Sequence, residues 1–189
     1  MNKKKILLVL FILAALVQLY VPAKMILDRE NVLATGKEYK FNVEPIDPSD
    51  PFRGKYITLR FKDTRFDNQT GVEWIKGETV YVRFKLDNNG FAIIDTVSEE
   101  KPTNTSDYLK TKIRYNRSVK FLFDRYYMEE SKAYQAEKLY KESRRDTSKV
   151  TYALVNIKNG KAVLKNVLIN GVPIRELVKK QQEIELQKE

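Results

Sequence analysis

The chain of 189 residues contains no cysteine and no histidine, and it has only 7 glycines and 6 prolines. The absence of cysteine excludes disulfides, thiolate nucleophiles and zinc fingers. The absence of histidine excludes Ser-His-Asp triads and imidazole acid–base catalysis. Any catalysis would therefore depend on Asp, Glu, Lys, Tyr, Ser or Thr. The low glycine and proline content, together with 42% hydrophobic residues, argues against a disordered chain and for one folded domain.

An uncharged run follows three lysines at the N-terminus. Lys3 to Lys5 precede Ile6–Ala23, a run long enough to cross a bilayer hydrocarbon core of about 30 Å as a helix. Lysines flanking such a helix stay on the cytoplasmic side. We therefore predict a single-pass anchor in the cell membrane over residues 1–23, with a cytoplasmic N-terminus and an extracytoplasmic domain. The competing prediction is a signal peptide cleaved near Ala23, which would yield a secreted soluble protein.

The net charge has to be corrected for this segment. The formal charge is +10, and removing three of the 35 basic residues leaves 32 against 25 acidic ones, so the exported part carries +7. Export argues against a nucleic-acid partner. The basic residues are scattered singly along alternating segments, which we interpret as a solvated surface. Anionic lipid headgroups are the partner that the charge still suggests.

Most of the chain after residue 37 alternates between polar and apolar residues in short segments, which is typical of β-strands. Asn88–Gly90 and Asn159–Gly160 are tight-turn sequences between two such segments each, and they predict β-hairpins. Strands are expected at 38–43, 56–61, 78–86, 91–97, 108–123 (as two short strands), 150–157 and 161–169. We predict a mainly β fold, an antiparallel sandwich or partly open barrel of about eight or nine strands.

Two segments lack this alternation. Residues 125–145 are rich in Ala, Glu and Lys without Gly or Pro, which favours an inserted helix. After Pro173, apolar residues recur at helical spacing, namely Ile174, Leu177, Val178 and Ile184. The predicted organisation is a juxtamembrane stretch at 24–37, an extracytoplasmic β-rich domain at 38–172 and a C-terminal helical tail at 173–189.

The most distinctive segment is Glu44–Phe61, which reads EPIDPSDPFRGKYITLRF. Its prolines push the residues before them towards extended conformations. Asp47 and Asp50 suit turns in which the carboxylate accepts from the backbone, and Arg53 lies within reach of either carboxylate. Gly54 permits a positive φ or a close backbone approach just before the strand that begins at Tyr56.

This segment resembles the signature of the GDYXXLXY family of small membrane-anchored bacterial proteins. Residues 54–61 (GKYITLRF) match its Gly, Tyr and Leu, with Lys55 in place of the acidic residue and Phe61 in place of the last Tyr. A second segment, residues 125–130 (RYYMEE), is similar to the family's R-Y-F-x-x-E. The resemblance implies an anchored protein of uncharacterised role that often accompanies polytopic membrane proteins.

The candidate binding or structural motif comprises Asp47, Asp50, Arg53, Gly54, Tyr56, Arg125, Glu129 and Glu130. We favour an interaction or structural role, in which the aspartates cap turns and the arginine ties the loop to the sheet. No full calcium loop is present, and we predict no catalytic residue, metal or cofactor. The predicted function is an accessory or binding protein with an integral-membrane partner. An exported hydrolase using Asp, Glu, Lys or Ser is the alternative, and it requires the 45–61 and 125–130 segments to meet.

Overall fold

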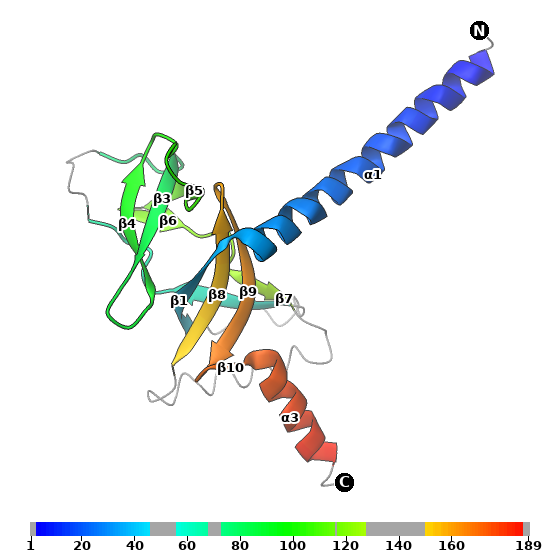
Figure 1. Cartoon of the computed structure of the whole chain (residues 1–189). Helices are drawn as coiled ribbons and strands as arrows, with labels where there is room; N and C mark the ends of the chain where they lie inside the picture. The colour runs from blue at the N-terminus through cyan, green and yellow to red at the C-terminus, as the bar shows by residue number, and fades with distance from the viewer. Residues whose placement is uncertain (1–2, 46–55, 68–72, 116, 128–149, 187–189) are drawn as a thin grey trace.

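The computed structural model of the chain describes residues 3–45, 56–67, 73–115, 117–127 and 150–186. These residues form a long N-terminal helix, ten strands and a short C-terminal helix (Figure 1). The elements are α1 (Lys3–Thr35), β1 (Lys37–Pro45), β2 (Tyr56–Phe61), β3 (Thr79–Leu86), β4 (Ala92–Ser98), β5 (Leu109–Tyr115), β6 (Ser118–Lys120), β7 (Arg125–Tyr127), β8 (Thr151–Lys158), β9 (Lys161–Ile169), β10 (Val172–Pro173) and α3 (Ile174–Leu186).

The strands form two curled antiparallel sheets, each resembling half of a barrel (Figure 1). The first has the order β10-β9-β8-β1-β2-β7, and the second has the order β4-β3-β5-β6. The sheets meet where Lys110 N in β5 donates to Gly160 O in the β8–β9 turn at 3.0 Å. The predicted mainly β, partly open barrel is confirmed. The described strands slightly outnumber the prediction because β7 and β10 are only three and two residues long.

The core consists of the inward-facing residues of both sheets. In β3 the side chains of Val80, Val82 and Phe84 are buried at alternate positions. Phe41 of β1 lies at the centre of a group of aromatic rings and joins the two sheets. Its ring centroid is 5.1 Å from that of Phe84 and 5.8 Å from that of Phe61. Alternation of polar and apolar residues therefore places the core as the sequence predicted.

Tight turns join the strands where the sequence predicted hairpins. Asn159 and Gly160 both have positive φ values, 49° and 80°, between β8 and β9. This backbone twist matches that of the flanking strands, which is why Asn-Gly is favoured in two-residue hairpin turns. The β3–β4 hairpin closes with Gly90 at a φ of 78°.

The helices predicted near the two chain ends are confirmed. The predicted start of the inserted helix, at Arg125, is wrong. Residues Arg125–Tyr127 form the strand β7 and not the start of a helix, and residues 128–149 lie outside the described part of the chain. In α3, Ile174 and Val178 are fully buried against the sheet. Ile184, which the spacing placed on the same face, is 52% exposed because the helix extends beyond the barrel.

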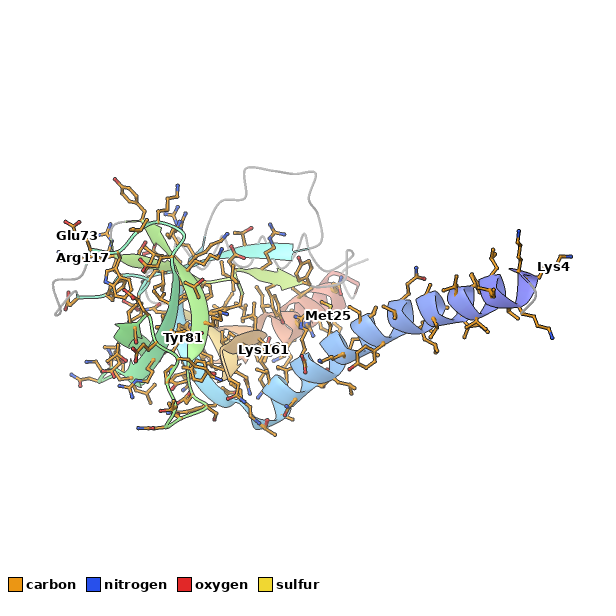
Figure 2. All side chains as sticks on the ribbon, turned by 90° about the horizontal axis from the view of Figure 1, so that it is seen from above. Lys4, Met25, Glu73, Tyr81, Arg117 and Lys161 are labelled. Carbon is orange, nitrogen blue, oxygen red and sulfur yellow. The ribbon has the colours of Figure 1, made fainter. Side chains whose placement is uncertain are left out.

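The N-terminal helix is long and apolar enough to cross a membrane, and its most apolar stretch has no residue buried in the structure. Figure 2 shows its first turns, marked by Lys4, standing far from the β domain. The helix does not stop at the end of the uncharged run. It continues through the predicted juxtamembrane stretch to Thr35, and β1 begins two residues later.

Candidate functional site

The strands of the two motif segments are neighbours in the first sheet. β2 pairs antiparallel with β7, so Tyr56 lies opposite Tyr127 and Thr58 lies opposite Arg125. The first sheet therefore brings the strand parts of both motifs together although they are far apart in the chain. The hydrolase hypothesis requires the 45–61 and 125–130 segments to meet, and the described strands of these two segments do so.

The remaining motif residues lie outside the described part of the chain. These are Asp47, Asp50, Arg53, Gly54, Glu129 and Glu130. The strand ends next to them are described: β1 ends at Pro45 and β7 ends at Tyr127, on either side of β2. Pro45 and Tyr127, the last described residues of these two strands, therefore lie at the same end of the sheet. The roles of these six residues stay predictions.

The second motif segment also joins the sheet to the C-terminal helix. Tyr126 is 3% exposed, and its hydroxyl donates to Asn166 Oδ1 in β9 at 2.8 Å. The guanidinium of Arg175 in α3 lies 5.2 Å from the centre of the Tyr126 ring and donates to Tyr127 O at 3.2 Å. Burial raises the pKa of Tyr126, which keeps the phenol neutral. Tyr126 is thus a packing residue, whereas the neighbouring Tyr127 is 56% exposed.

A polar cluster that the sequence did not reveal links β1 to the loop before β5. Tyr39 donates to Asp107 Oδ2 at 2.6 Å, and Lys37 Nζ pairs with the same oxygen at 2.9 Å. Burial, followed by the hydrogen bond to Asp107, raises the pKa of Tyr39 to about 12. The hydrogen bond to Asp107 raises the pKa of Lys37 as well. Both groups therefore keep their protons at neutral pH, and their contacts with Asp107 hold the loop before β5 against β1.

The end of α1 is fixed to the β8–β9 hairpin. Val32 is 3% exposed, and the buried amide of Asn156 in β8 donates to Leu33 O at 3.0 Å. Two surface contacts add to this junction: Lys161 of β9 pairs with Asp28, and Lys158 Nζ donates to Thr35 Oγ1 at 2.6 Å. The helix and the barrel are joined through packing and hydrogen bonds as well as through the chain.

Gly36 makes the tight connection between helix and strand possible. A Cβ atom at this position would lie 2.5 Å from Val32 O and 3.0 Å from Ile157 O. Both are backbone atoms held in regular structure, so a side chain would force the helix end away from β8. Only glycine lets the helix end approach the sheet this closely.

The described residues contain no group of three or more acidic side chains that would hold a metal ion. Comparison with curated proteins and with solved structures finds no match. A family model described as "GDYXXLXY protein" matches residues 18–167, from the second half of the apolar run to β9. The matched region covers most of the chain and includes both motif strands, and the chain therefore belongs to the GDYXXLXY family.

Proposed function

We propose that this protein is a membrane-anchored, extracytoplasmic binding or accessory component that acts with an integral-membrane partner. The observation that carries the proposal is the continuous α1 helix, whose apolar half is unpacked and whose polar end is fixed to the β domain. A flexible linker would let the domain sample all orientations, whereas a docked helix holds one face of the barrel towards a fixed neighbour.

The junction sets how far the barrel stands from the bilayer. At a rise of about 1.5 Å per residue, Thr35 lies about 18 Å beyond Ala23, and Asp28, which pairs with Lys161 of β9, lies about 7.5 Å beyond it. The headgroup layer on one side of a bilayer is about 5–8 Å thick. The nearest part of the barrel would therefore reach the edge of the headgroups, and the rest would stand at the height of the extramembrane loops of a polytopic protein.

The unpacked apolar helix offers the partner a second contact. Large side chains such as Leu7, Phe11 and Leu19 are more than two-thirds exposed. In a bilayer these side chains contact either lipid or another transmembrane helix. The three lysines before them favour a cytoplasmic N-terminus, which leaves the barrel outside the cytoplasm.

The orientation is tested with introduced cysteines, because the natural chain has none. Tyr115→Cys places a thiol on β5, at a position that is 72% exposed. Asn2→Cys places one before the apolar run. We expect a membrane-impermeant maleimide to label the first variant in intact cells and the second only after lysis. The reverse labelling pattern would show a cytoplasmic barrel.

The anchor and the partner are tested on the full-length protein from membranes. An intact mass that includes the N-terminal lysines supports the anchor, and a mass beginning after Ala23 shows the secreted form. Formaldehyde crosslinking in intact membranes should give an adduct of higher mass than the monomer. A variant with residues 6–23 replaced by a Leu-Ala helix tells whether the partner contacts the apolar helix or the barrel. Recovery of the wild-type protein only as a monomer would contradict the proposal.

A further inference from the structure

An opening interrupts an otherwise regular strand ladder on the barrel wall. β2 pairs with β7, and Leu59 N continues the ladder by donating to Asp124 O at 2.8 Å. Beyond residue 63 the same two chain segments pair again, because Val119 N donates to Thr64 O at 2.9 Å. The register is the same on both sides of the gap. Residues 60–63 therefore lie opposite residues 120–123 without a shift.

Within the described residues, no backbone hydrogen bond joins 60–63 to 120–123. The backbone groups there bond to neighbouring strands instead. Lys62 N donates to Asn42 O of β1 at 3.1 Å, and the Thr111 hydroxyl of β5 donates to Lys120 O. Beneath the gap the rings of Phe61 and Phe121 pack with centroids 5.2 Å apart. The opening thus has an apolar floor. Hydrogen bonds to β1 and β5 use backbone groups at its two edges that would otherwise pair across it.

The rim of this opening is strongly basic. It borders a cavity of about 680 Å³, a size typical of small-molecule sites. Five cations line the cavity, and one carboxylate, Asp124, accompanies them; the cations are Arg60, Lys76, Lys112, Arg114 and Lys120. All five side chains are exposed, and in the described part of the chain none forms an ion pair.

Some basic residues elsewhere on the barrel have acidic partners. Lys165 pairs with Glu38 at 2.7 Å, and Lys85 pairs with Asp95 at 3.5 Å. The five cations around the opening instead line one cavity together, with a single carboxylate among them. Unpaired like charges beside an apolar wall concentrate a positive potential, which attracts anions. Two of the five are arginines, whose planar guanidinium matches phosphate oxygens in pairs.

A ligand would reach the opening from the aqueous phase and not from the bilayer that holds α1. Arg117, in the turn between β5 and β6, lies at the end of the molecule opposite Lys4 (Figure 2). Arg114 precedes this turn on β5, and Lys120 follows it on β6. We propose that the opening between residues 60–63 and 120–123 binds a water-soluble ligand that carries more than one phosphate group. This site depends on the barrel alone and on neither the orientation nor a partner.

The test uses the full-length protein in micelles of an uncharged detergent, with tripolyphosphate as the probe. We expect saturable binding by calorimetry, weakened at least tenfold in the Lys112→Gln/Arg114→Gln variant. The matched control is Arg83→Gln/Lys85→Gln on β3, which removes the same charges at the same spacing away from the opening. The control should bind within twofold of wild type. Equal losses in both variants, or no saturable binding, would overturn the proposal.

Three further measurements keep the test specific. Citrate, a tricarboxylate, should bind at least fivefold more weakly, and equal binding would overturn the preference for phosphate. A short-chain phosphatidylglycerol should also bind more weakly, and tighter binding would overturn the assignment to a soluble ligand. The charge-preserving Lys112→Arg/Arg114→Lys variant should keep its affinity. Loss of binding in this variant while its melting temperature is unchanged would show that charge at the rim does not carry the site.

Discussion

The junction between α1 and the barrel can be weakened by one substitution, Asn156→Ala. Asn156 is 4% exposed, and its amide nitrogen lies 3.0 Å from Leu33 O and 3.4 Å from Gly36 O. These carbonyls belong to the last turn of the helix and to the residue after it. The substitution removes both donations without touching the apolar core of the barrel.

The loss of stability in Asn156→Ala depends on both polar atoms of the amide, its donating nitrogen and its oxygen. The shorter bond, to the carbonyl of the half-buried Leu33, contributes most of the stabilisation, and its loss costs about 1–3 kcal/mol. The variant also removes Asn156 Oδ1, which is buried without a hydrogen-bond partner among the described residues and so offsets part of that cost. We expect a net loss of about 1–2 kcal/mol, which raises the undocked population about 5- to 30-fold.

Spin labels at Ile26→Cys in α1 and Tyr115→Cys in β5 report the junction directly. The wild-type distance distribution should be narrow, and Asn156→Ala should broaden it increasingly with temperature while the barrel still melts cooperatively. Lys158→Ala is the control, because it removes only an exposed contact to Thr35 and should cost about 0.5 kcal/mol or less. An unchanged distribution in Asn156→Ala would refute the role of this amide.

Three further predictions concern the barrel, each measured by denaturation of the full-length protein in micelles. Phe41→Ala should cost about 3–5 kcal/mol because it empties the centre of the ring cluster, whereas Tyr115→Ala, 72% exposed, should cost about 0.5 kcal/mol or less. Ile174→Ala should cost about 2–5 kcal/mol and Ile184→Ala little, so equal effects would contradict the docking of α3. The raised pKa of Tyr39 means that the unfolded chain loses this proton first, so stability should fall between pH 10 and about 12. The stability of Tyr39→Phe should fall less over that range, and an identical pH dependence would contradict the raised pKa of Tyr39.

The elements predicted correctly are those specified by nearby residues. β2 and β9 begin and end where the alternation does, and Asn159-Gly160 forms the turn that its own φ preferences favour. The apolar helix and the start of α3 follow from residue type and spacing alone. None of these depends on a distant part of the chain.

The strand β7 could not be predicted in the same way. Its three residues are too few to show an alternation, and they precede a segment of good helix formers. They form a strand because β2 supplies the backbone partners and Asn166 of β9 accepts from the buried Tyr126 hydroxyl. Both partners are remote in sequence, and helix propensity is a weak preference that such pairing overrides. The Lys37–Asp107–Tyr39 cluster escaped prediction for the same reason.

The basic opening is a feature that the interpretation of single charges as a solvated surface does not include, although all five cations are exposed. Each cation alternates with apolar residues along its own strand, and alone it is typical of a solvent-facing position. The five residues come from β2, the segment before β3, β5 and β6, and these segments meet only because β6 bonds to β5 and to the chain after β2. The net charge of the domain is therefore a poor guide to the ligand proposed for this cavity. Removing two cations from β3 lowers that net charge as much as removing two from β5, but only the second change lowers the positive potential of the cavity.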